Sequence, residues 1–157
     1  MLALKNTLEV LANVLQKVIV ALALTMLCSL ALQVFMRFVL GKALSWSEEL
    51  ALACFSWVML LSIALGVRHS IHVRMDLLID RLPSKLRHRA NQAIWLAIAG
   101  LGCFIGWSGF NYVRDSLGTT SAAIGYPIAW LYASAPVSGC LIAIFAFEHV
   151  LMDEPAP

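Results

Sequence analysis

Residues 46–67, WSEELALACFSWVMLLSIALGV, begin with two adjacent carboxylates and then run without a charge from Leu50 to Val67. A helix of about 20 apolar residues crosses the roughly 30 Å hydrocarbon core of a bilayer. Three further windows, 18–36, 93–110 and 127–147, are also apolar and contain no Asp, Glu, Lys, Arg or His. Because lipid offers the backbone no hydrogen-bond partners, all four windows are predicted to be helices.

The composition excludes a soluble globular domain. Hydrophobic residues make up 61% of the 157 and charged residues 13%, which is more apolar side chain than one core of this size can bury. We expect an all-α membrane protein with one membrane domain over 1–157 and an uncleaved N-terminal anchor. The expected spans are about 14–37, 47–68, 90–113 and 127–149.

The basic residues are distributed unevenly around these spans. Lys and Arg that flank short loops favour the cytoplasmic side. With both termini in the cytoplasm, the inner set is Lys5, Lys17, Arg68, Arg74, Arg81, Lys85, Arg87 and Arg89, and the outer set is only Arg37, Lys42 and Arg114. The sequence therefore predicts cytoplasmic N- and C-termini.

The connection between the second and third spans has a helical pattern of its own. Its apolar positions are Met75, Leu78, Ile79 and Leu82. Their spacing predicts a short amphipathic helix over about 73–82, lying along the inner membrane surface with its arginines near anionic headgroups. His72 and Asp76 are one helical turn apart and form a candidate local pair.

Glu48 and Glu49 stand at the outer lip of the second span. In the first turn of a helix, carboxylates interact favourably with the helix dipole, and Ser45 or Ser47 is a candidate cap for the exposed amides. Capping alone explains one acid. In the first interpretation of this motif, the two acids simply belong to a solvated helix start.

The second interpretation is a structural latch. Arg37 ends the first span and Arg114 ends the third at the same depth as the two acids. Trp46 and Trp57 bracket the site and shield it from full solvent. We expect at least one acid to pair with one of these arginines or with a basic residue of a partner protein.

Small residues and prolines mark the last two spans. The third carries Gly102-x-x-x-Gly106 and the fourth carries Gly139, so their backbones can approach closely. Ordinary packing inside the chain and a dedicated interface to another protein both remain open. Pro127 is expected to open the last helix after an irregular connection, and Pro136 to kink it.

Cysteines and histidines give no sign of redox or metal chemistry. The cysteines fall one in each span, at Cys28, Cys54, Cys103 and Cys140, and are interpreted as packing residues. The histidines are His69, His72, His88 and His149, all at or beyond the span ends, whereas a membrane haem needs pairs within the bundle. We expect no catalytic, metal-binding or substrate-binding residue, no cofactor and no nucleic-acid partner.

Several motifs in order resemble one known family, the DctQ-like small membrane subunits of tripartite ATP-independent periplasmic (TRAP) transporters. They are QVFMR at 33–37, WSEE at 46–49, Trp57, Arg68, HVRMDLL at 72–78, LP at 82–83, SAAIGYP at 121–127 and YASAP at 132–136. The resemblance extends from Leu32 to Gly139. Gln33 stands where the family usually has Asn, and Ser62 where Gly is common.

The resemblance implies a four-helix subunit of the bacterial inner membrane. It would pair with a large permease subunit and work with a soluble periplasmic substrate-binding protein that binds transiently. The large subunit would carry organic acids inward with sodium by an elevator motion, while the small one, surrounded by membrane lipids, holds the scaffold fixed. The candidate structural or interface residues are Arg37, Trp46, Glu48, Glu49, Trp57, Arg68, His72, Asp76, Gly102, Gly106, Pro127 and Pro136.

The residues themselves favour the same role. Substrate and ion paths through membranes require ionisable or strongly polar groups near the midplane, and the four windows contain no Asp, Glu, Lys, Arg or His. Two alternatives stay open at this point. A small homodimeric exporter would need a membrane-embedded carboxylate, and a membrane anchor of a redox enzyme would need histidine ligands within the bundle.

Overall fold

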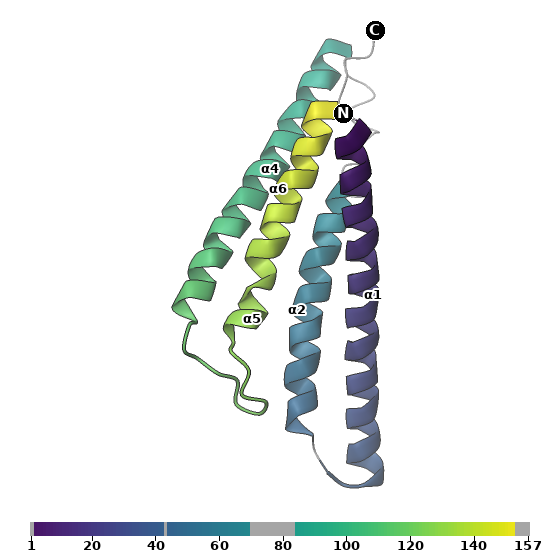
Figure 1. The fold of residues 1–157 in the computed structure, drawn as a ribbon, viewed down its shortest axis with the longest axis vertical. Helices are drawn as coiled ribbons and strands as arrows, with labels where there is room; N and C mark the ends of the chain where they lie inside the picture. The colour runs from purple at the N-terminus through teal and green to yellow at the C-terminus, as the bar shows by residue number, and fades with distance from the viewer. Residues whose placement is uncertain (1, 43, 70–83, 153–157) are drawn as a thin grey trace.

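Long helices make up most of this computed structural model, which describes residues 2–42, 44–69 and 84–152 (Figure 1). They are α1 (Leu2–Val39), α2 (Ser45–Arg68), α4 (Ser84–Asp115) and α6 (Ser134–Met152), with the single turn α5 (Ala129–Tyr132) just before α6. The expected interfacial helix at 73–82, with His72 and Asp76, lies outside the described residues.

Four helical segments are long and apolar enough to cross a membrane. They are Asn6–Val39, Ser45–Arg68, Arg89–Asp115 and Ala129–Val150. Within the described ranges, β-type pairing is limited to an isolated bridge between Thr120 and Pro127. The all-helical, four-span prediction is confirmed to this extent.

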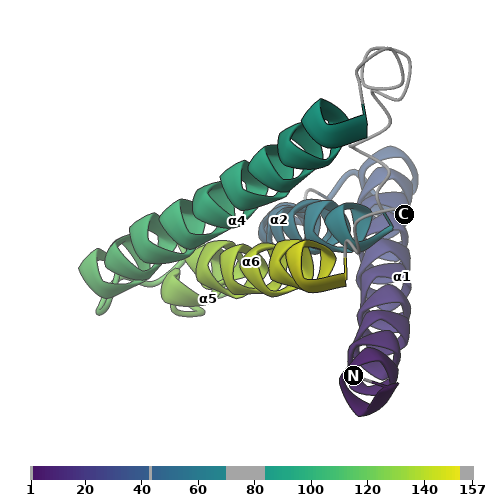
Figure 2. The same ribbon diagram turned by 90° about the horizontal axis from the view of Figure 1, so that it is seen from above.

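The helices pack in the order α1, α2, α6, α4, so that α2 and α6 lie inside the row and α1 and α4 at its edges (Figures 1 and 2). Burial follows this order. The apolar window is 33% buried in α2 and in α6, but 17% in α4 and 6% in α1. The two edge helices therefore leave most of their apolar surface uncovered by this chain.

The chain runs up and down, so the helix ends fall into two groups (Figure 1). The start of α1, the end of α2, the start of α4 and the end of α6 lie together, and we call this the terminal end. The opposite end, where 40–44 joins α1 to α2 and 116–128 joins α4 to α5, is the hairpin end. With 38 residues, α1 is about 57 Å long and supplies contacts at both ends.

Glycines on α4 and α6 allow the two helices to approach each other closely. A Cβ on Gly102 would lie 2.8 Å from the Ala143 amide nitrogen, and one on Gly139 would collide with the backbone of Gly106. A Cβ on Gly106 itself would meet its nearest atom at 3.8 Å. The structure thus brings both candidate glycines of α4 close to α6 within the chain, while an interface to another protein stays a prediction.

The last span is broken as Pro136 suggested. Helix α5 ends at Tyr132 and α6 begins at Ser134, so the interruption falls at Ala133. Proline has no amide hydrogen and its ring crowds the carbonyl four residues earlier, here that of Tyr132. The expected opening of the helix at Pro127 is wrong, because Pro127 pairs with Thr120 and the helix starts at Ala129.

Candidate functional site

At the hairpin end, Glu49 holds the connection between α4 and α5. Its carboxylate accepts hydrogen bonds from the Ser121 hydroxyl at 2.7 Å, the Ala123 amide at 2.8 Å and the Ile124 amide at 2.9 Å. A carboxylate with several donors is a strong anchor, because hydrogen bonds to a charged acceptor are stronger than neutral ones. We call this connection, residues 119–127, the Glu49 loop.

The Glu49 loop also has bonds of its own. The Ser121 amide donates to the Tyr126 carbonyl at 2.9 Å, and the Ile128 amide donates to that of Thr119 at 3.0 Å. Gly125 adopts φ +77°, a left-handed conformation that favours glycine. Burial, and then the charge of Glu49, raise the pKa of Tyr126.

Glu48 has a different and simpler contact. Its carboxylate accepts a 2.7 Å hydrogen bond from the side-chain amide of Gln33, which links α2 to α1. The neighbouring acids therefore tie the start of α2 in two directions. Glu48 connects it to the first helix, and Glu49 connects it to the loop before the last one.

Two details of the expected hairpin-end site differ in the structure. Among the described residues, neither acid forms an ion pair with Arg37 or Arg114, and Gln33 and the Glu49 loop supply the donors; pairing with a basic residue of a partner protein stays a prediction. No serine side chain caps α2 either: the N-cap residue is Leu44, and the buried Ser47 hydroxyl donates to the Leu44 carbonyl at 2.7 Å.

The tryptophans of the motif differ in their roles. The Trp57 indole donates to the Trp130 carbonyl at 3.1 Å, so that it joins α2 to α5. One position earlier, the Ser56 hydroxyl lies 3.1 Å from that of Ser134 at the start of α6. Trp46 is exposed and is available to the membrane interface or to a partner.

At the terminal end, Arg68 connects three helices. Its Nε lies 3.5 Å from the Glu148 carboxylate of α6, and its guanidinium donates a hydrogen bond to the Leu8 carbonyl of α1. The guanidinium carbon is 5.6 Å from the centre of the Phe145 ring. Since Arg68 and Glu148 are 13% and 8% exposed, this is a largely buried ion pair.

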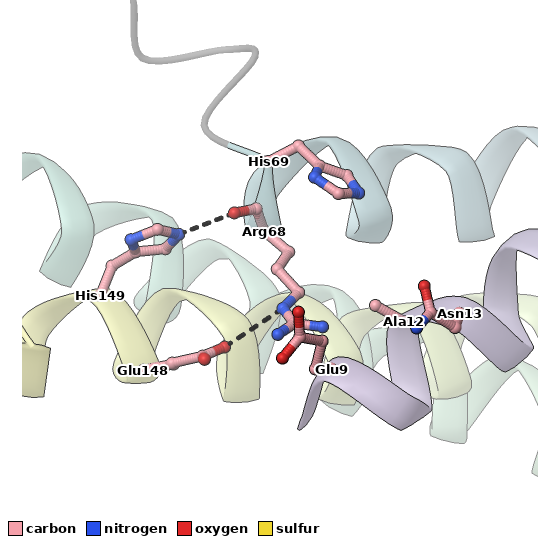
Figure 3. Close-up of a pocket in the computed structure, with 7 residues that line it drawn as sticks. All are labelled: Glu9, Ala12, Asn13, Arg68, His69, Glu148 and His149. Carbon is pink, nitrogen blue, oxygen red and sulfur yellow. Dashed lines mark hydrogen bonds and ion pairs between the residues drawn. The ribbon is translucent and has the colours of Figure 1, made fainter. Parts of the chain in front are cut away.

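His149 connects this junction to the remaining helix, α4. One ring nitrogen lies 3.0 Å from the Arg68 carbonyl, at the end of α2. The same ring stacks on Trp95 of α4, with centroids 4.0 Å apart and an angle of 9°. A hollow of about 410 Å³ lies at this junction. Its lining residues, drawn in Figure 3, are Glu9, Ala12, Asn13, Arg68, His69, Glu148 and His149.

Sequence reasoning found Arg68 but missed its partners. Glu148 and His149 follow directly on an apolar window that ends at Phe147, where the sequence has no motif like WSEE to mark them. The available signal was an acid placed at the same membrane end as Arg68, where an opposite charge is the expected neighbour of a half-buried cation.

The contacts at both ends join helices and loops of the same chain. Among the described residues, no group of three or more His, Cys, Asp or Glu side chains is positioned to hold a metal ion. The charged contacts lie at the two ends of the helix row, and the apolar windows between them contain no Asp, Glu, Lys, Arg or His.

Residues 26–154 match the family model of the DctQ component of tripartite ATP-independent periplasmic transporters. The chain belongs to this family. It is a multi-pass membrane protein and a small permease subunit of the TRAP type. The earlier alternatives, an exporter and a redox anchor, are superseded by this assignment.

Relatives from several bacteria are similar over much of the chain. The sialic acid TRAP transporter small permease protein SiaQ of Vibrio cholerae is 26% identical over 94% of this chain and 85% of its own. The ectoine TRAP transporter small permease protein TeaB of Halomonas elongata is 28% identical over 88% and 74%. The sialic acid TRAP transporter permease protein SiaT of Haemophilus influenzae is 32% identical over 70% of this chain, but the match spans only 18% of that longer protein.

Proposed function

We propose that this chain is the fixed scaffold subunit of a TRAP transporter. It pairs with a separate large permease subunit and holds it in place during sodium-coupled uptake of an organic acid, which a soluble periplasmic binding protein delivers. The chain is not an enzyme and carries no solute alone. It lies in the bacterial inner membrane with both termini in the cytoplasm.

The observation that carries this proposal is the location of the charges. A path for an anion or a sodium ion needs polar groups near the membrane midplane. In the described chain the charged groups with partners, Glu48, Glu49, Arg68 and Glu148, lie near the helix ends. Their partners belong to the same chain, which suits a rigid support.

The uncovered edges of the helix row support a partner in the membrane. Helices α1 and α4 each pack mainly on one neighbour and are the least buried of the spans. SiaT is a much longer permease protein with a segment similar to this chain. A large permease body beside the row would cover such an edge.

The names of the relatives support a role that is separate from substrate choice. Similar small permease proteins belong to transporters named for sialic acid, ectoine and C4-dicarboxylates. A subunit shared by transporters of such different solutes fits a scaffold better than a binding site.

Co-purification tests the pairing directly. The chain, carrying an affinity tag, is co-expressed with the large TRAP permease subunit of the same bacterium and extracted in mild detergent. We expect the large subunit to elute with the tagged chain as one species in size-exclusion chromatography. An untagged chain is the control for non-specific retention. Separate elution of the two proteins would contradict the scaffold proposal.

A further inference from the structure

The Glu148 carboxylate is buried with one oxygen unsatisfied. The residue is 8% exposed, and its Oε2 accepts no hydrogen bond from the described residues. The Nε of Arg68 supplies a charge 3.5 Å away, a distance longer than that of an ordinary hydrogen bond, while Nη1 of the same guanidinium donates to the Leu8 carbonyl. A buried oxygen without a donor is costly, so it indicates a missing partner.

The same carboxylate lines the hollow at the terminal end (Figure 3). Two carboxylates, Glu9 and Glu148, face one guanidinium, Arg68, so with neutral histidines the lining has a formal charge of −1. Helices α2 and α6 also end here, and their last carbonyls favour a cation. Charge and hydrogen bonding therefore both call for a positively charged donor.

We propose that this hollow binds the ammonium group of a lysine side chain from the large permease subunit, between Glu9 and Glu148. The inference rests on the proposed pairing of the two subunits. An ammonium group has three donors and no acceptor, which suits two carboxylates. Its single charge also balances the single excess negative charge of the lining.

Two features favour a protein lysine over the amine of a lipid headgroup. A headgroup amine brings a phosphate close behind it, and the exposed Glu9 at the rim would repel that phosphate. The hollow also adjoins α1, the least covered edge of the row, where a second membrane protein has room to pack. A lysine stem is apolar and lies readily along such a surface.

Zero-length cross-linking of the purified complex tests this site. A carbodiimide joins a carboxylate to an amine that touches it: the carbonyl carbon bonds to the nitrogen, and the carboxylate oxygen leaves in the urea product. Peptide mass spectrometry should find Glu9 or Glu148 joined to a lysine of the large subunit. The variant Glu9→Gln should lose any link at position 9, while Glu48→Gln, altered at the hairpin end, should keep the terminal-end link.

Each other result would overturn the lysine assignment. A glutamate joined to the amine of an ethanolamine lipid, recognised by the added mass of the lipid, would identify a headgroup as the ligand. A link to Lys5 or Lys85 would place the donor within this chain. An intact complex without a link at either glutamate would refute the lysine contact but leave the pairing standing, whereas failure of the subunits to co-purify would refute the proposed function itself.

Discussion

At the scale of single residues, the two acids of the WSEE motif have unequal importance. Glu49 accepts donors on both carboxylate oxygens, from Ser121, Ala123 and Ile124, whereas Glu48 accepts one bond, from Gln33, on Oε1. A glutamine keeps one oxygen and replaces the other with an NH₂ donor. We therefore expect Glu48→Gln to be nearly neutral, because the remaining oxygen can still accept the bond from Gln33. In Glu49→Gln, the new NH₂ group would face a hydrogen-bond donor of the loop.

This difference gives the first prediction. Glu49→Gln should release the Glu49 loop, so that amide hydrogen exchange in residues 119–127 becomes faster, while Glu48→Gln leaves it unchanged. Exchange measured by mass spectrometry on the peptide that contains Ala123 and Ile124 distinguishes the two variants. Equal protection in Glu49→Gln and the wild type would show that the carboxylate does not hold the loop.

The second prediction concerns the buried pair at the terminal end. Arg68→Gln leaves the Glu148 carboxylate without its cation, and removing one partner of a buried pair typically costs about 3–5 kcal/mol. We expect a clearly lower thermal unfolding midpoint in detergent, and partial recovery when Glu148→Gln is added, because both charges are then absent. A double variant less stable than Arg68→Gln alone would contradict this account.

At the scale of elements, the contact of α4 with α6 depends on specific glycines. A Cβ on Gly139 would collide with the backbone of Gly106, which cannot move aside as a flexible side chain can. A Cβ on Gly100 would meet nothing within 4 Å, although it lies on the same helix as Gly102 and Gly106.

These glycines supply the third prediction. Gly139→Ala should lower the thermal unfolding midpoint, since overpacking typically costs about 1–3 kcal/mol. The matched control Gly100→Ala should be neutral or slightly stabilising, because alanine favours helix over glycine by roughly 0.5–1 kcal/mol. If both variants melted alike, the close α4–α6 approach would be wrong.

The elements also show what the sequence makes predictable. Apolar length alone gave the four helices, and Pro136 gave the break at Ala133. The partners of the acids were not predictable in this way. Opposite charge points to Arg37 and Arg114, whereas the donors in the structure include the backbone amides of Ala123 and Ile124. Every non-proline residue carries such an amide, so no residue type marks it.

At the scale of the whole molecule, the row of helices also escapes sequence reasoning. Each span is apolar nearly all round, so its pattern does not reveal which faces meet other helices and which meet lipid. Only contacts in three dimensions place α2 and α6 inside the row and α1 and α4 at its edges. Those uncovered edges are what make a membrane partner a reasonable proposal.

Orientation is the fourth prediction and belongs to the whole chain. The excess of Lys and Arg around the termini and the 69–89 connection favours a cytoplasmic terminal end. In a variant lacking the four native cysteines, an impermeant thiol reagent added outside should label Ala122→Cys and spare Ser84→Cys. Position 122 is exposed and avoids the Ser121 hydroxyl that Glu49 binds. The reverse labelling pattern would invert the topology.

The central claim is that this chain supports transport without carrying a solute, and sodium-driven uptake in proteoliposomes tests it most directly. Vesicles that contain this chain alone, the large subunit alone, or both are given a sodium gradient, the cognate binding protein and labelled substrate. We predict uptake only where the large subunit is present with this chain. Robust uptake by vesicles that contain this chain alone would contradict the account.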